Sequence, residues 1–476
     1  MPSIAPGRGT LASVAAQGVP PRLRTLLDAV EPLSRRFEQA GRRLYLVGGS
    51  VRDALVGADL DAIDLDLTTE ARPDDVLRLV RGVADQVWEQ GRAYGTIGVA
   101  VGGRRVEITT HRAEVYRSDS RKPEVTFGDE IEVDLSRRDF TINAMALDLA
   151  TLRLVDPYGG AADLAQHRLA TPLDPEVSFG DDPLRMLRAA RFIARFDLVP
   201  DEALVAAATE LAPRLEIVSA ERIRDELDRI LLVPTPSVAL WFLVRTGLAS
   251  QFLPELDALA LEQDPIHRHK DVLAHTLAVV DKTQPDRLLR LASLFHDVGK
   301  PKTRAIGPDG VSFHHHEVVG ARMTRARMEQ LRYPTDDVGT VARLVELHLR
   351  FHTYKMGWTD RAVRRYVRDA GEHLTRLNEL TRCDCTTRNA RRARELAARM
   401  DELEARIAEL REQEALDAMR PELDGNAVMA RLGIPPGREV GEALAFLLDL
   451  RLDEGLLGEE EAGRRLVAWW AARAGA

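Results

Sequence analysis

The stretch Leu46-Val-Gly-Gly-Ser-Val-Arg-Asp53 joins an apolar run to a helical pattern through two consecutive glycines. The run Leu44–Val47 predicts a buried strand, and a helix is expected directly after the glycines. Glycines let a backbone approach a ligand closely, and the first turn of a helix offers N–H groups to phosphate. We therefore predict that Gly48 and Gly49 bind a phosphorylated ligand, with the Arg52 guanidinium as a further partner for the same phosphate.

Two aspartates follow in the next predicted strand, which spans residues 63–67. Asp64 and Asp66 are one residue apart, so both project from the same face of that strand. Glu107, in the predicted strand Val106–Thr110, is either a third carboxylate of the same site or an edge-strand residue. Carboxylates beside a phosphate-binding turn suit Mg²⁺, so the pattern predicts a magnesium site for phosphoryl or nucleotidyl transfer.

This order of motifs resembles the head of the nucleotidyltransferase branch that includes bacterial class II CCA-adding enzymes and poly(A) polymerases. A second motif, Arg137-Arg138-Asp139-Phe-Thr-Ile-Asn143, is predicted to open a helix and matches a string from the nucleotide site of that branch. Arg137 or Arg138 can reach a phosphate, and Asp139 and Asn143 can hold a ribose hydroxyl. Which of the two arginines contacts the nucleotide stays open.

A third motif places Asp182, Arg185, Arg188 and Arg191 three residues apart, which predicts one stripe on a helix. An ionised aspartate only accepts hydrogen bonds and an arginine only donates them, so the pair Asp182–Arg185 matches cytosine and adenine. Guanine and uracil would leave buried groups unpaired, at a cost of roughly 1–3 kcal/mol each. The family resemblance implies the same role, a protein template that selects CTP and ATP.

Histidines and aspartates form another ordered set further along the chain. Its members are His275, His296, Asp297, His316, His348 and Asp384. A His-Asp dipeptide in helical sequence with distant partners resembles the HD phosphohydrolase superfamily, whose sites bind one or two divalent metals. Imidazole ligands favour transition metals such as Mn²⁺, Co²⁺ or Ni²⁺, so a second metal is expected here beside the Mg²⁺ of the head.

Length and composition set the domain organisation. With 476 residues, two cysteines and no apolar run of 18 residues, the chain suggests several domains, no disulfide framework, no membrane span and a cytoplasmic location. Its net charge of −9 does not decide whether it binds nucleic acid. The predicted parts are a disordered tail at 1–25, the head at 26–160, a helical neck with the RNA-binding region at 161–262, an HD domain at 263–390 and a helical body and tail at 391–476.

The predicted fold is an α/β nucleotidyltransferase head, a small mixed sheet with helices, followed by an all-α neck, an HD-type helical block and a helical tail. The resemblance implies a CCA tRNA nucleotidyltransferase that uses CTP and ATP and binds the acceptor arm and 3′ end of tRNA. Neither DNA nor a membrane is an expected partner, and the oligomeric state stays open.

Three alternatives remain. A poly(A) polymerase has the same head. A CC-adding enzyme lacks a flexible loop for which Ala113–Asp129 is long enough, so this segment favours full CCA addition. An alternative of another class is an HD-type phosphohydrolase whose head only binds nucleotide.

Overall fold

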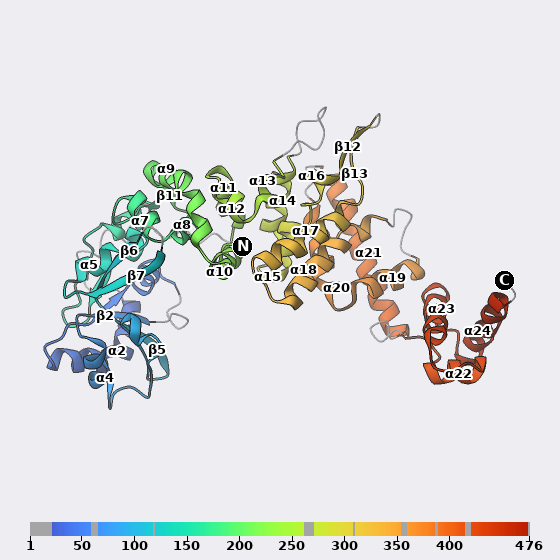
Figure 1. Ribbon diagram of the computed structural model, residues 1–476, viewed down its shortest axis with the longest axis horizontal. Helices are drawn as coiled ribbons and strands as arrows, with labels where there is room; N and C mark the ends of the chain where they lie inside the picture. Colours follow the sequence, from blue (N-terminus) through green and yellow to red (C-terminus); the bar gives the residue numbers. More distant parts are fainter. Residues whose placement is uncertain are drawn as a thin grey trace. The chain divides into compact units, whose positions relative to one another are not determined.

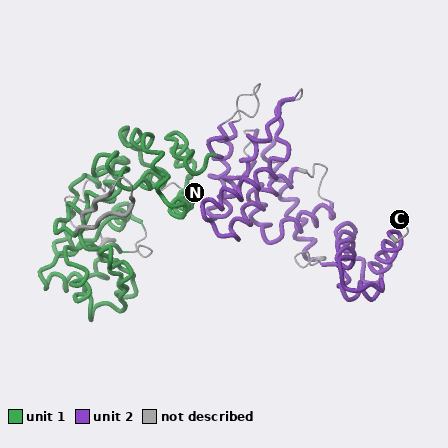
Figure 2. Tube along the Cα trace, viewed as in Figure 1, with its two compact units in different colours: residues 1–254 green, residues 255–476 purple. Residues whose placement is uncertain are grey.

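A computed structural model describes residues 21–58, 65–117, 120–260, 271–307, 310–353, 359–385, 389–414 and 420–474. It divides into two compact units, residues 1–254 and 255–476, which Figure 2 colours separately. Asp64 and residues 1–20 of the predicted tail lie outside the described residues. Helix α2, Pro21–Gln39, begins within the segment that was predicted as a tail. No described helix is both long and apolar enough to cross a membrane.

The first unit contains a seven-stranded sheet with the strand order β3-β4-β5-β2-β1-β8-β9. Two of its strands, β2 and β5, are labelled in Figure 1. Strands β2 and β5 are parallel, whereas the other neighbouring pairs are antiparallel, so the sheet is mixed as predicted. The strands are β1 Tyr45–Val47, β2 Leu65–Thr69, β3 Gln86–Trp88, β4 Thr96–Val101, β5 Arg104–Thr110, β8 Ala146–Asp148 and β9 Leu154–Val155.

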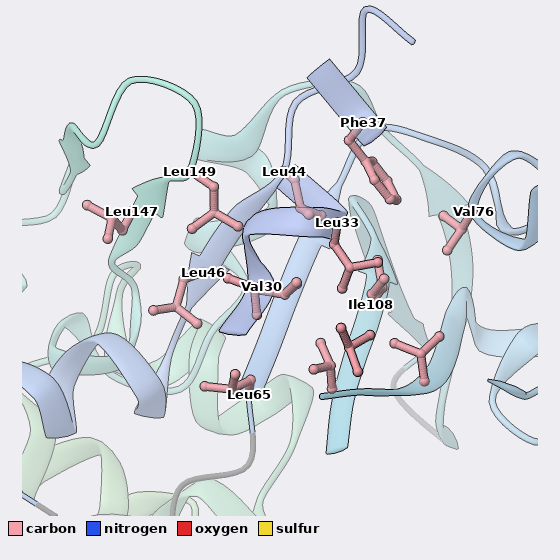
Figure 3. Close-up of a cluster of buried hydrophobic side chains, with 14 of the residues drawn as sticks. Val30, Leu33, Phe37, Leu44, Leu46, Leu65, Val76, Ile108, Leu147 and Leu149 are labelled. Atoms are coloured by element: carbon pink, nitrogen blue, oxygen red, sulfur yellow. The ribbon is translucent and has the colours of Figure 1, made fainter. Parts of the chain in front are cut away.

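One face of this sheet is apolar and packs against helices α2 and α4, Pro73–Val80 (Figure 3). Leu65 and Leu67 point to that face, where they meet Phe37 of α2 and Val76 of α4 in a cluster of buried side chains. Because side chains alternate along a strand, Asp66 projects from the opposite face and is exposed. The hydrophobic core thus fixes which face carries the predicted metal ligand.

Several predicted strands are confirmed and others need correction. The sequence also predicts strands at Thr96–Val101 and Leu152–Val155. Strand β4 has the predicted bounds, whereas β9 begins only at Leu154, because Leu152 lies in a turn with φ 58°. The predicted loop Ala113–Asp129 mostly forms an antiparallel hairpin of β6, Arg112–Arg117, and β7, Ser120–Phe127. This stretch is rich in charged residues and has no regular apolar alternation, so periodicity gave no strand signal.

The rest of the first unit is helical. Its helices are α3 Gly49–Leu55, α5 Ile131–Ser136, α6 Gly160–Ala165, α7 Pro175–Asp181, α8 Leu184–Phe196, α9 Glu202–Glu210, α10 Ala220–Leu231, α11 Pro236–Arg245 and α12 Leu248–Phe252. Two short parallel strands, β10 Arg168–Leu169 and β11 Val199–Pro200, were not predicted in this region. Helix α8 packs against α10 and α11, and Arg185 and Arg191 of the arginine stripe on α8 are buried.

The second unit is almost entirely helical. Its helices are α13 Pro254–Asp257 at the border, α14 Val272–Lys282, α15 Arg287–Phe295, α16 Lys300–Thr303, α17 His316–Gln330, α18 Thr335–Leu347, α19 Asp360–Ala370, α20 Leu374–Asp384, α21 Ala390–Glu414, α22 Gly425–Leu432, α23 Arg438–Glu454 and α24 Glu459–Ala474. A hairpin of β12, Arg304–Gly307, and β13, Gly310–Phe313, departs from the all-helical expectation.

Candidate functional site

The turn between β1 and α3 can form only with glycine at position 48. Gly48 has φ 68°, in the left-handed region, and a Cβ built there would lie 2.6 Å from Nη1 of Arg138. The Gly48 N–H donates to the carbonyl oxygen of Met145 at 3.1 Å. The predicted phosphate turn therefore lies directly against Arg138, which makes Arg138, of the two candidate arginines, the one at the turn.

The carboxylates of Asp66 and Glu107 lie on neighbouring strands. Asp66 on β2 is the register partner of Glu107 on β5, and because these strands are parallel both side chains leave the same face of the sheet. The Asp66 N–H donates to Oγ of Ser50 on α3 at 3.4 Å, which ties β2 to the glycine turn. Nη2 of Arg105 lies 3.5 Å from Glu107 Oε1 at the exposed edge of the pair.

Arg52, which we predicted to bind phosphate, is buried and paired inside the protein. Its guanidinium donates to Asp53 Oδ1 at 2.8 Å and to Oδ1 of Asn143, and it lies 4.6 Å from the centroid of the Phe196 ring. Burial lowers the pKa of this guanidinium from its ordinary value. In this structure Arg52 connects α3 to α8 and to the motif around Asn143.

The motif Arg137–Asn143 does not open an α-helix as predicted. Helix α5 ends at Ser136, and a single 3₁₀ turn, Thr141–Asn143, leads into β8. The chain enters the sheet at Ala146, so there is no room for a longer helix. Asp139 Oδ1 accepts from the Phe140 N–H and from Asn143 Nδ2, both at 2.9 Å.

Asp139 is also bound by Arg188 from α8. Its Oδ2 accepts from Nε and Nη2 of Arg188 at 2.8 and 2.5 Å. Although burial opposes ionisation, the charge of Arg188 and the Asn143 hydrogen bond outweigh it and lower the pKa of Asp139 to about 2. Four donors use all the lone pairs of a carboxylate, so Asp139 holds the motif together from within.

Asp134 is a site residue that the sequence analysis missed. Its side chain is fully buried, and its two oxygens accept from Nη2 of Arg137 at 2.6 Å and from Nη2 of Arg138 at 3.2 Å. Burial would raise the pKa of this carboxyl, but the two arginines together hold it below its ordinary value. The spacing of three and four residues on a short helix was the sequence signal that could have indicated it.

The predicted stripe divides between two elements. Asp182 is not on α8, because Pro183 disfavours a helical conformation in the residue before it, and Asp182 instead ends α7 in an extended conformation. Arg185 is buried, and its guanidinium donates to Ser178 Oγ at 2.9 Å and to the Arg137 carbonyl oxygen at 2.5 Å. Arg191 is buried in an ion pair with Glu226 of α10, a partner that the sequence did not indicate.

The histidines and aspartates of the second unit converge in one buried cluster, as the HD resemblance implies. His275 Nε2 lies 2.9 Å from Asp384 Oδ1 and 3.3 Å from His296 Nε2. Two sets of ligand atoms lie close enough together to hold an ion, and both include Asp297. The first contains His275 and His296, and the second contains His316 and His348.

Backbone carbonyls orient three of these rings in the same way. Nδ1 of His296, His316 and His348 lies 2.7, 2.8 and 2.6 Å from the carbonyl oxygen three residues earlier. Because a carbonyl only accepts, Nδ1 carries the proton of the neutral ring, and Nε2 keeps a lone pair that faces the cluster. Among the described residues, His348 Nε2 has no hydrogen-bond partner although it is buried. A buried lone pair of this kind fits a metal ligand.

Electrostatics of the cluster favour a cation. The carboxylates of Asp297 and Asp384 outweigh burial and raise the pKa of His296 to about 10, so this ring is protonated at neutral pH and a metal would displace its Nε2 proton. Burial lowers the pKa of His348 to about 3, so that ring is neutral. Lys300, which the sequence analysis missed, donates to Asp297 Oδ2 at 2.6 Å. Carboxylates and neutral imidazoles on one centre match the ligand preferences of divalent transition metals.

Comparison with known proteins assigns the family. The A-adding tRNA nucleotidyltransferase of Deinococcus radiodurans is 36% identical over 444 residues, which cover 90% of this chain and 95% of that enzyme. The chain belongs to the class II CCA-adding enzyme and poly(A) polymerase family. It is a tRNA nucleotidyltransferase, and the resemblance drawn from the sequence motifs is confirmed.

Other matches agree with this assignment. The CCA-adding enzyme of Limosilactobacillus reuteri strain DSM 20016 is 35% identical over 237 residues, or 50% of this chain and 57% of that enzyme. Family models match the poly A polymerase head domain at 44–170, the probable RNA and SrmB-binding site of polymerase A at 197–259 and the HD domain at 271–410.

A solved structure confirms the fold of this tRNA nucleotidyltransferase. The CCA-adding enzyme of Bacillus stearothermophilus in complex with CTP superposes with a TM-score of 0.70 at 23% identity and covers 96% of this chain and 99% of its own. The predicted fold class, a nucleotidyltransferase head followed by largely helical domains, is therefore correct.

Proposed function

We propose that this chain adds C, C and A to the 3′ end of tRNA from CTP and ATP, without a nucleic-acid template. One observation carries the proposal: Asp66 and Glu107 share a face in register, beside a glycine turn that lies against Arg138. In this arrangement, carboxylates that could bind a metal ion lie next to the Arg138 cation and next to a backbone turn that a triphosphate can approach closely. The names of the relatives and the CTP complex support the same substrates.

In this proposal Asp64 and Asp66, with Glu107 as a third carboxylate, hold Mg²⁺. Bound there, the ion would neutralise the triphosphate and activate the attacking 3′-hydroxyl of the tRNA. Arg138 would contact the phosphates from the glycine turn. Asn143 keeps one amide hydrogen and one oxygen lone pair beyond its bonds to Asp139 and Arg52, so we assign the ribose hydroxyl to Asn143.

Base selection is assigned to Asp182 and Arg185. Each oxygen of Asp182 accepts one hydrogen bond in the protein, which leaves lone pairs for an exocyclic amino group. Arg185 uses three of its five N–H groups on Ser178 and Arg137, which leaves donors for a ring nitrogen. This combination matches the Watson–Crick edges of cytosine and adenine.

A second specificity within the same reaction is addition of A alone. It is favoured by the A-adding relative from Deinococcus radiodurans, of which this chain covers 95%. Incubating the protein with tRNA transcripts that end before C, CC or CCA, with CTP and ATP, distinguishes addition of C, C and A from addition of A alone. Growth of the transcript without CCA to full length supports CCA addition, and extension of only the CC-ending transcript with ATP supports A addition. A long run of A residues would instead indicate a poly(A) polymerase.

We also propose that the HD cluster binds divalent transition metal and supports phosphohydrolase activity. The carrying observation is the convergence of Nε2 atoms from His275, His296, His316 and His348 around Asp297, with Asp384 bound to His275. Metal analysis after incubation with Mn²⁺, Co²⁺ or Ni²⁺ and removal of free ion tests it directly.

For the domains we keep the predicted ranges as a proposal: head 26–160, neck and RNA-binding region 161–262, HD domain 263–390 and helical body and tail 391–476. The tRNA acceptor arm would contact the neck, where the RNA-binding family model matches. A cytoplasmic location is part of this proposal.

A further inference from the structure

The carboxylate of Asp182 is held by a residue from a different helix. Nη2 of Arg222, on α10, donates to Asp182 Oδ2 at 2.7 Å. Within the described part of the chain, the other oxygen, Oδ1, accepts only the backbone N–H of Leu184 at 3.2 Å. Arg222 is 40% exposed at its side chain and Asp182 is 21% exposed, so this ion pair lies where the bundle meets solvent. Arg222 is thus the one side chain that fixes the orientation of Asp182 among the described residues.

Arg185 is fixed by other elements. Its guanidinium is bound by Ser178 of α7 and by the carbonyl oxygen of Arg137 after α5, and it is buried. The acceptor and the donor proposed to read the base are therefore anchored independently. Loss of one anchor would move one of the two groups and leave the other in place.

Asp182 also interacts electrostatically with a second cation, Arg188 of α8. The charge of Asp182 contributes to raising the pKa of Arg188, so the two groups attract each other. With Arg222 present, Oδ2 of Asp182 is directed toward α10. Without it, the carboxylate is drawn toward the arginines of α8, where it would neutralise the donors that a nucleotide base needs.

We propose that Arg222 is a specificity-determining positioning residue, which keeps Asp182 available as the acceptor for the amino group of cytosine and adenine. This inference rests on the proposed role of Asp182 and Arg185 in base selection. Arg222 itself need not touch the nucleotide. Its expected signature is a change in which nucleotide is incorporated, with a smaller change in how well tRNA binds.

The test compares Arg222→Gln, Arg222→Lys and Asp182→Asn with the wild-type chain. The ratio of kcat/KM is measured for CTP against UTP on a transcript that lacks CCA, and for ATP against GTP on one that ends in CC. We expect Arg222→Gln to reduce discrimination about tenfold, the scale of one lost charged hydrogen bond. Arg222→Lys keeps the charge and should lose less, while the KM for tRNA stays near wild type.

Arg224→Gln is the matched control, because Arg224 lies on the same helix and pairs with Asp225. It should leave discrimination unchanged. Circular dichroism melting confirms folding, and if Arg222→Gln does not fold, Arg222→Lys and Asp182→Asn still decide the question. Wild-type discrimination in the folded Arg222 variants, with reduced discrimination in Asp182→Asn, would overturn the role of Arg222. Wild-type discrimination in Asp182→Asn as well would overturn the proposed base-selecting pair itself.

Discussion

The first unit and the HD cluster differ in the partners that hold their carboxylates and imidazoles. In the first unit, Asp134, Asp139 and Asp182 are each bound by arginines from the same or another element. In the HD cluster, backbone carbonyls bind Nδ1 of the imidazole rings, and the Nε2 atoms face one another. Among the residues that the structure describes, His348 Nε2 has no hydrogen-bond partner. These three carboxylates are neutralised by arginines of the protein, whereas the ligand atoms of the HD cluster are proposed to bind a metal ion.

This difference predicts how each site responds to change. A substitution in one of these three ion pairs removes one member of a network and releases its partner, so effects spread to neighbouring residues. A substitution in the HD cluster removes a ligand, so its effect appears as lost metal. The following experiments test that contrast.

The largest effect is expected from Asp66→Ala or Asp64→Ala. Loss of a carboxylate from the proposed magnesium site should reduce nucleotide incorporation roughly a thousandfold while the fold is retained, because stabilisation of developing charge is lost. Incorporation of labelled CTP and ATP measures this. Asp74→Ala, at an exposed residue of the head paired with Arg92, is the control. Substantial activity in either variant would exclude that aspartate from the mechanism.

The double variant His296→Ala, Asp297→Ala should lose bound transition metal and any metal-dependent phosphatase or phosphodiesterase activity. It should retain nucleotide addition, because the magnesium ligands lie in the other unit. Metal content by elemental analysis and tRNA extension are measured on the same preparation. His314→Ala, an exposed histidine of the same block, controls for nonspecific binding. Equal metal content in the variant and the wild type would contradict a metal cage at this position.

Asp139 should make stability depend on pH in an acidic window. Its folded pKa of about 2 lies below the ordinary value of 3.8, so its contribution is complete above about pH 4 and is lost as the pH falls toward 2. Its size is about 2 kcal/mol in the free energy of unfolding. Urea unfolding at several pH values should show that, in this window, the free energy of unfolding of Asp139→Asn depends less steeply on pH than that of the wild type. An unchanged slope would mean that Asp139 is not held ionised by Arg188.

The smallest effect is expected for Arg185→Gln. Glutamine both donates and accepts, so its side-chain oxygen can accept from the ring N–H of uracil and guanine. This removes one of the two mismatches, while their carbonyl oxygen still faces Asp182, and their incorporation should rise about tenfold relative to cytosine and adenine. Competition between nucleotides on one transcript measures this ratio. Arg195→Gln, on the same helix and partly exposed, is the comparison. If total activity falls but selectivity does not, Arg185 binds phosphate and does not read the base.

Local pattern predicted the parts of the fold that depend on local chemistry. The sequence predicted a strand at 63–67, which overlaps β2, with Asp64 and Asp66 on one face of it, and the glycine pair predicted the turn that Gly48 makes. Strands β3, β6 and β7 were missed because they are short or rich in charged residues. Their formation depends on pairing with a neighbouring strand and not on a hydrophobic periodicity in the sequence.

In the candidate sites, too, local sequence patterns predicted some features and long-range contacts determined others. Motifs located the residues, but their partners came from distant segments: Arg222 is 40 residues from Asp182, and Arg188 is 49 residues from Asp139. No pattern in one sequence signals such pairs. Asp134 is different, because its spacing to Arg137 and Arg138 was visible in the sequence. The helix boundary at Asp182 was also readable from Pro183, which follows it.

The carbonyls that orient the HD imidazoles have a mechanical consequence. His296 and His348 directly follow the last turns of α15 and α18, and each ring is bound to a carbonyl of that turn, Ser293 or Val345. Unwinding of either helix end would rotate a ring away from the cluster, so loading of an ion and fraying of these ends oppose each other. Amide hydrogen exchange in the last turns of α15 and α18 should therefore become slower as a larger fraction of the molecules binds an ion in the cluster.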